Sequence, residues 1–107
     1  MKNLGQMMKQ AQEMQARMQA MQERLEEEEV AGASGGGMVS VTLNGKGALR
    51  RIRIDPTLAN PDDVEMLEDL IVAAFSDAKA KVEALVAARM SELTGGIQLP
   101  PGFKMPF

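Results

Sequence analysis

Residues 38–54 read MVSVTLNGKGALRRIRI, and this stretch has the pattern of a β-hairpin. Apolar and polar residues alternate over 39–43, which is the period of a strand that is buried on one face. The run Asn44-Gly45-Lys46-Gly47 then supplies the positive-φ residues that a tight hairpin turn needs. The sequence therefore predicts two antiparallel strands at the centre of the chain.

The second strand of this hairpin covers residues 49–54, and basic and apolar side chains alternate over 51–54. Because successive side chains of a strand point to opposite faces, we expect Ile52 and Ile54 to point inward. Arg51 and Arg53 then point outward. The hairpin has one apolar face and one basic outer strip, and another element must cover the apolar face.

Small residues precede the hairpin. Residues 30–34 indicate a short edge strand, and the three glycines at 35–37 indicate a flexible turn. Together with the hairpin they predict a three-stranded antiparallel meander over residues 30–55. Both glycine runs lead into strands and lack the Lys-Ser/Thr ending of a phosphate-binding loop, so we interpret them as turns.

A long amphipathic helix is predicted over residues 1–29. Its apolar residues follow a heptad-like spacing of three and four, and no proline interrupts it. We favour an ordinary core stripe for this seam. The alternative is a methionine-rich groove for a partner, because methionine packs adaptably. The seam consists of Leu4, Met7, Ala11, Met14, Met18, Met21 and Leu25.

A second long helix is predicted over residues 60–94. Asn60 has the chemistry of a capping residue, Pro61 suits the first helical position, and acidic residues follow near the positive end of the helix dipole. Gly95-Gly96 is a plausible stop, and the apolar, proline-rich tail 95–107 is expected to dock on another surface. The predicted apolar stripe consists of Leu67, Leu70, Ile71, Ala74, Phe75, Ala78, Val82 and Leu85.

Length and composition narrow the function further. The 107 residues suit a single domain, 1–107, of the α+β class. The chain contains no cysteine, histidine, tryptophan or tyrosine, which excludes disulfides and thiolate or imidazole chemistry. We therefore expect no enzyme, metal, cofactor or small-molecule substrate. No long apolar run or leader pattern is present, so a cytoplasmic protein that does not bind membranes is expected.

The predicted helices are too long for a monomer of this size. Residues 61–93 would form a rod about 50 Å long, whereas a compact globule of this length is roughly 33 Å across. Exposing so long an apolar stripe costs free energy at about 25 cal/mol per Å². We expect an obligate two-fold homodimer whose helix ends project as arms.

The chain resembles the YbaB/EbfC family of nucleoid-associated proteins across essentially its whole length. This resemblance implies a helix, a three-stranded antiparallel sheet and a helix, assembled as a tweezer-like dimer. It also implies binding to double-stranded DNA and roles in chromosome organisation and gene expression at the nucleoid. Five blocks carry it: LGQMMKQAQ at 4–12, VSVTLNG at 39–45, IDP at 54–56, MLEDL at 66–70 and LPPGFKMPF at 99–107.

Three groups of basic residues are candidates for contacting DNA phosphates. The first recurs along one face of the first helix, the second lies on the distal half of the second helix, and the third is a cluster in the last strand. Each also has an ordinary interpretation, namely a solvated face, compensation of the helix dipole, or ion pairs at a dimer interface. The groups are Lys2, Lys9, Arg17 and Arg24; Lys79, Lys81 and Arg89; and Arg50, Arg51 and Arg53.

Two functions therefore remain open. In the first, a DNA-binding homodimer contacts mainly phosphates, because no recognition helix or aromatic wedge is present. In the second, a protein-interaction adaptor grips apolar helices with its Met-rich arms and binds DNA weakly or indirectly. The formal net charge of −3 favours the adaptor, so DNA binding must depend on local basic patches.

Overall fold

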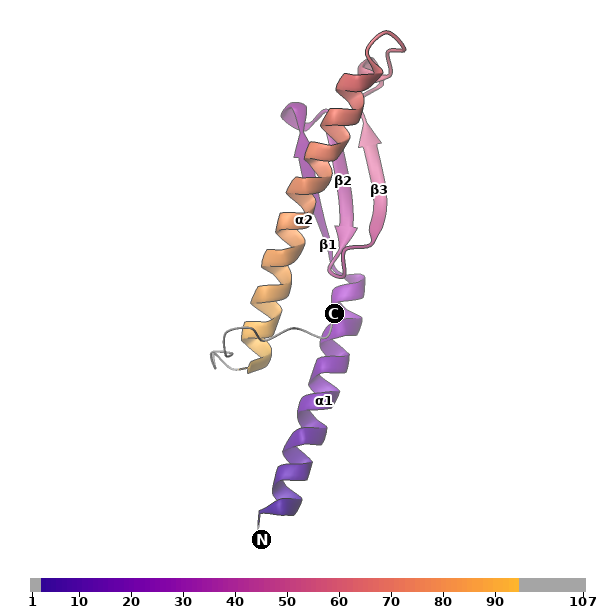
Figure 1. Cartoon of the computed structure of the whole chain (residues 1–107). Helices are drawn as coiled ribbons and strands as arrows, with labels where there is room; N and C mark the ends of the chain where they lie inside the picture. Colours follow the sequence, from indigo (N-terminus) through magenta and orange to yellow (C-terminus); the bar gives the residue numbers. More distant parts are fainter. Residues whose placement is uncertain (1–2, 95–107) are drawn as a thin grey trace.

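The computed structural model describes residues 3–94, and it confirms the predicted order of helix, three strands and helix (Figure 1). The expectations for Lys2 and for the tail 95–107 lie outside the described residues. Short 3-10 turns at Gly35–Gly37 and Pro56–Leu58 connect some of the elements. The elements are α1 (Leu4–Glu27), β1 (Glu29–Ser34), β2 (Val39–Asn44), β3 (Leu49–Ile54) and α2 (Val64–Thr94).

The sheet is antiparallel with the order β1-β2-β3. Val41 of β2 lies opposite Gly32 of β1 and Ile52 of β3. The register shifts where Thr42 pairs with Arg51, because Leu43 then pairs with Leu49. Arg50 is therefore an extra residue in β3, as in a β-bulge.

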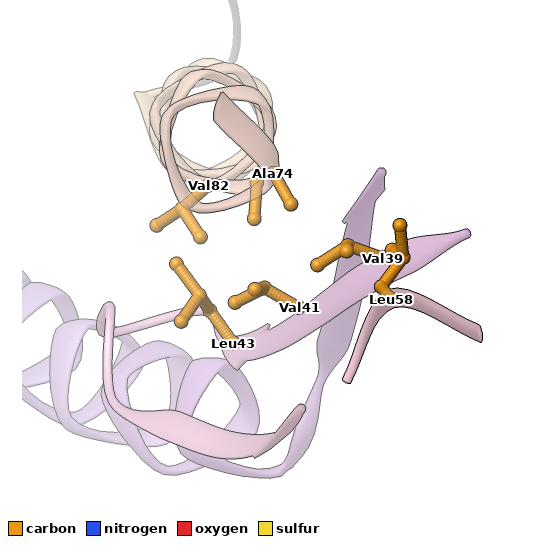
Figure 2. Close-up of a cluster of buried hydrophobic side chains, with 7 residues drawn as sticks. Val39, Val41, Leu43, Leu58, Ala74 and Val82 are labelled. Atoms are coloured by element: carbon orange, nitrogen blue, oxygen red, sulfur yellow. The ribbon is translucent and has the colours of Figure 1, made fainter. Parts of the chain in front are cut away.

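α2 packs against the sheet over β1 and β2, and the closest approach is at Gly32. A Cβ atom at Gly32 would lie 2.7 Å from the Cα atom of Ala78, so only glycine fits there. Ala74 and Ala78 are fully buried on this face of α2. Figure 2 shows side chains of β2 pointing toward α2 in this core. The buried cluster contains Val39, Val41, Leu43, Leu58, Ala74, Ala78 and Val82.

β3 lies beside this core without being covered by it. Ile52 and Ile54 are on the same face as Val41, as expected, but they are 42% and 39% exposed. The predicted face is confirmed, but α2 does not cover these two side chains within one chain. A helix is about 10 Å wide and strands are about 4.8 Å apart, so one helix covers two strands. The third strand keeps an open apolar face.

α1 packs on the rest of the chain only near its C-terminal end. Met21 and Leu25 are buried against Met90 of α2, whereas Met7 and Met14 are exposed. The interpretation of the seam as an ordinary core stripe is therefore wrong before Met18 within one chain. Figure 1 shows α1 extending away from the sheet, and the molecule measures 73 × 26 × 17 Å. We call the exposed part of α1, residues 4–20, the arm.

α2 begins later than predicted, at Val64. The Asn60 side chain accepts a hydrogen bond from the backbone N–H of Asp62 at 3.0 Å, which forms a turn in place of a helix cap. Asp63 instead accepts from the N–H of Met66 at 3.3 Å and takes the capping role. The prediction of Asn60 and Pro61 as helix start is wrong because Asn60 bonds locally within a turn.

The β2–β3 turn also differs in detail from the expectation. Within it only Gly47 has a positive φ, 85°. Gly45 is required for a different reason, because a Cβ atom there would lie 2.6 Å from the carbonyl oxygen of Leu25. The Gly45 N–H donates to that oxygen at 2.8 Å. The hairpin tip therefore rests on the end of α1.

Replacing Gly32 with alanine tests the close packing of α2 on β1. The new methyl group must push the two backbones apart, so Gly32→Ala is expected to lower the free energy of unfolding by about 1–3 kcal/mol or more. Urea denaturation measures this change. Gly5→Ala is the matched control, since a Cβ atom at Gly5 meets nothing within 4 Å. Equal effects of the two variants would contradict the packing argument.

Candidate nucleic-acid interface

The arm carries exposed basic side chains. Lys9 and Arg17 have no ion-pair partner within residues 3–94, and both are exposed. Arg24 follows Arg17 two turns later, where the arm joins the body. Helical geometry places residues seven apart on nearly the same side, so Arg17 and Arg24 share one side of α1. The arm therefore presents cations that are available to an external anion.

Arg89 is occupied by an internal ion pair. Its Nε donates to Glu28 Oε2 at 3.0 Å and its Nη2 donates to Glu28 Oε1, and the two side chains are only 19% and 25% exposed. The hydrogen bond from Arg89 lowers the pKa of Glu28. The same pairing raises the pKa of Arg89. This bidentate pair ties α2 to the junction between α1 and β1.

Lys81 is held against the edge of β1. Its Nζ donates to the carbonyl oxygen of Ala31 at 2.9 Å and lies 3.4 Å from Asp77. Asp77 accepts from the N–H of Ala33 at 3.0 Å, and this hydrogen bond lowers the pKa of Asp77. Two side chains of α2 thus occupy backbone groups along the outer edge of β1. An edge protected in this way is closed to another strand.

The structure does not bring the three candidates on α2 together. Lys79 and Lys81 are two residues apart, so they project on different sides of the helix. Arg89 lies two turns further on, in its pair with Glu28. Arg89 lines a groove together with Arg17 and Arg24 of α1, whereas Lys79 and Lys81 are not among the residues that line it. The prediction that these cations complete a basic lining together with α1 stays a prediction.

The arginines of β3 have mixed environments. Arg51 donates to Glu29 Oε1 at 2.8 Å, and Arg50 donates to the carbonyl oxygen of Glu26 at 3.1 Å. Arg53 has no such partner within residues 3–94. Arg51 and Arg53 pair across from Thr42 and Ser40, on the sheet face away from α2. The predicted outer basic strip is therefore present.

A groove lies where α1 and α2 meet, with a volume of about 370 Å³. It is lined by Arg17 and Arg24 of α1 and by Arg89 and Glu92 of α2. Sequence reasoning did not single out Glu92, although its spacing of three from Arg89 is a known signal for a helical ion pair. No local signal links Glu28 with Arg89, which is 61 residues away.

One of the two acidic groups of the chain lies far from the arm, whereas the other, Glu26–Glu29, lies where α1 joins the body. Residues 60–75 contain five acidic and no basic side chains. Figure 1 places the start of α2 at the opposite end of the molecule from the start of α1. The negative net charge is thus distributed unevenly along the long axis.

Other kinds of site find no support in the part of the chain that the structure describes. No helix between residues 3 and 94 has the length and apolar character needed to cross a bilayer. The same residues contain no group of three or more acidic side chains placed to hold a metal ion. The exposed cations of the arm remain the clearest candidate site.

Comparison with known proteins identifies relatives over the whole chain. The model of the YbaB/EbfC DNA-binding family matches residues 1–97. Nucleoid-associated proteins of Rhodospirillum centenum and Rhodospirillum rubrum are 65% and 59% identical over 107 residues, all of both chains. A crystal structure of an uncharacterized protein from Helicobacter pylori has a TM-score of 0.76 and 27% identity, covering 86% of this chain and 97% of that one.

The pair between Glu28 and Arg89 predicts a pH dependence of stability. A carboxylate whose pKa is lowered by folding stabilises the fold above its ordinary value of 4.5, and this stabilisation is lost as the pH falls through the lowered pKa. Glu28→Gln is expected to lower the free energy of unfolding by about 1–2 kcal/mol at pH 7. The loss should disappear in acid, as urea denaturation at several pH values will measure.

Glu13→Gln is the control for this test, because Glu13 lies on the arm without an ion pair inside residues 3–94. Its unfolding free energy should follow that of the wild type at every pH. Parallel pH profiles for Glu28→Gln and the wild type would refute the stabilising role of the pair.

Proposed function

The chain belongs to the YbaB/EbfC DNA-binding family, and we propose that it binds double-stranded DNA as a homodimer, mainly through backbone phosphates. In this proposal the protein acts at the cytoplasmic nucleoid, where it takes part in chromosome organisation and gene expression. The relatives are named as nucleoid-associated proteins, and the matching family is one of DNA-binding proteins rather than of enzymes.

One observation carries the proposal: the arm holds Lys9 and Arg17 exposed and unpaired within residues 3–94. A basic side chain that already has a carboxylate partner must give up that partner to bind a phosphate. Lys9 and Arg17 meet no such cost. Their contacts to phosphates carry no base information, which favours binding with little sequence preference.

The negative net charge does not prevent this binding. The molecule is 73 Å long, whereas the Debye length at physiological ionic strength is about 8 Å. The acidic stretch at residues 60–75 is therefore screened from a duplex that rests on the arm. Local charge on the arm, where Lys9 and Arg17 outnumber the single acidic residue Glu13, governs the interaction in place of the formal charge of the chain.

The open face of β3 supports a homodimer. Ile52 and Ile54 of β3 are exposed, and Phe75 of α2 is exposed as well. Phe75 follows Ala74 by one residue, which turns it away from β1 toward the β3 side of the helix. We call the exposed side chains Ile52, Ile54 and Phe75 the β3 face. We infer that a second copy covers it through a two-fold, self-complementary interface.

The sheet edges favour the same interface. Asp77 and Lys81 of α2 already occupy the edge of β1. β3 forms the other edge of the sheet, and its residues are exposed throughout. A second copy at the β3 face would leave the arms of both copies (Figure 1) projecting from one body, where both could contact one duplex.

A second function is favoured by the apolar side of the arm. Leu4, Met7, Met8 and Met14 are all exposed. Exposed apolar patches of this kind often mark a surface for another protein. The alternative is therefore an adaptor that binds an apolar helix along the arm, with weak or indirect DNA binding.

Neutralising the free cations of the arm tests the DNA-binding proposal. Lys9→Gln with Arg17→Gln should weaken binding to unrelated duplexes alike, because phosphate contacts are lost. The slope of log K against log salt should become shallower by about 1 for each contact removed. Fluorescence anisotropy at several salt concentrations measures both effects.

The matched control adds the same negative charge elsewhere, through Ala59→Glu with Ala73→Glu at exposed positions. Its DNA affinity should stay close to that of the wild type. If control and test variants lose affinity equally, only net charge matters and the arm is not the binding surface. A wild type that binds no duplex at any salt would favour the adaptor.

A charge on the β3 face tests the homodimer. Ile52→Glu would bury a carboxylate without a partner in the interface, which is strongly unfavourable. Sedimentation equilibrium should show dissociation at concentrations where the wild type is dimeric. Ala59→Glu adds the same charge to an exposed loop and should leave the dimer intact. A dimeric Ile52→Glu variant would place the interface elsewhere.

A further inference from the structure

The groove between α1 and α2 gathers three arginines around the carboxylate of Glu92. Arg89 Nη1 lies 3.1 Å from Glu92 Oε1, and Arg24 Nη1 lies 4.0 Å from Glu92 Oε2. Arg17 lines the same groove without an ion pair inside residues 3–94. Each carboxylate oxygen of Glu92 thus faces a different arginine.

The arginines of the groove differ in how many of their N–H donors are used in hydrogen bonds. Glu28 takes the Nε and Nη2 donors of Arg89, which leaves Nη1 for Glu92. Arg24 is 57% exposed and lies 3.9 Å from Glu28, beyond hydrogen-bond distance. Its ion pair with Glu92, at 4.0 Å, is also too long for a hydrogen bond, so the N–H donors of Arg24 make no hydrogen bond within residues 3–94. The groove contains more positive than negative groups and several unused N–H donors.

Glu92 is held loosely in this position. Its side chain is 57% exposed, and an ion pair in such surroundings contributes little to stability because water competes for both partners. A phosphodiester has the same charge as a carboxylate and also presents two oxygens to an arginine fork. The groups that hold Glu92 are thus suited to hold a phosphodiester in its place.

We propose that this groove binds a phosphodiester of the DNA backbone and that Glu92 is its internal competitor. The inference rests on the proposed DNA-binding function and adds a site at the base of the arm. When DNA binds, the Glu92 carboxylate turns out to solvent and the phosphate contacts Arg17, Arg24 and the free donor of Arg89. The pair between Arg89 and Glu28 stays in place and keeps the groove in shape. Glu92 therefore lowers the affinity for DNA.

The test compares two glutamates on one helix. Glu92→Gln removes the competitor, and Glu83→Gln makes the same charge change at an exposed position of α2 that has no ion pair inside residues 3–94. Binding of an unrelated duplex is measured by fluorescence anisotropy at low and at physiological salt. We expect Glu92→Gln to raise the affinity at low salt about threefold or more, with a steeper salt slope. Glu83→Gln should have a smaller effect.

A double-mutant cycle with Arg24→Gln shows whether the gain belongs to the groove. The gain from Glu92→Gln should largely disappear in the Arg24→Gln background, because the arginine that receives the phosphate is missing. Thermal unfolding of each variant checks the fold. Since Glu92 is exposed and its removal leaves the Arg89–Glu28 pair intact, Glu92→Gln should fold normally.

Each outcome has a distinct meaning. If the wild type binds DNA but Glu92→Gln behaves like Glu83→Gln, the competitor role is wrong while the proposed function stands. A gain that survives in the Arg24→Gln background would show a general charge effect and would also overturn the inference. If the wild type binds no duplex at either salt concentration, the proposed function fails, and the inference fails with it.

Discussion

The width of one helix against three strands is the constraint on which the rest of this structure depends. α2 lies so close to β1 at Gly32 that its axis is held over β1 and β2. A helix placed there cannot reach the third strand, because it is only about as wide as two strands. The isoleucines of β3 consequently stay exposed, although their spacing is that of core residues. The fold of one chain thus leaves the apolar face of β3 uncovered.

The contacts at the C-terminal end of α1 set the direction of the arm. Met21 and Leu25 of α1 pack on Met90, the hairpin tip at Gly45 rests on the last turn of α1, and Arg89 holds Glu28. These contacts all lie at the C-terminal end of α1, so the rest of the helix projects. Projection separates the basic side chains of the arm from the acidic start of α2. A chain with negative net charge can in this way present a basic surface.

Much of the fold follows from local patterns. The alternation over 39–43 predicts β2 and the face it buries, the Asn-Gly-Lys-Gly run predicts the turn, and the spacing of three and four predicts both helices. The predicted start of α2 at Asn60 is wrong because the Asn60 side chain forms a hydrogen bond within its own turn. The exposure of Ile52 did not follow from the sequence, because periodicity assigns a residue to a face and does not say whether that face is covered. Coverage depends on where a distant helix packs.

The sequence by itself determined the order of the elements, the faces of the strands and the exclusion of cysteine and histidine chemistry, because these depend on neighbouring residues or on composition. Only the tertiary structure decided which cations are free. Lys81 and Arg89 were candidates equal to Lys9 and Arg17 in the sequence, yet Lys81 binds Ala31 and Arg89 binds Glu28. Their partners lie 50 and 61 residues away in the chain. The packing of α2 on the sheet brings these distant residues into contact, and a local sequence pattern does not reveal contacts between residues so far apart in the chain.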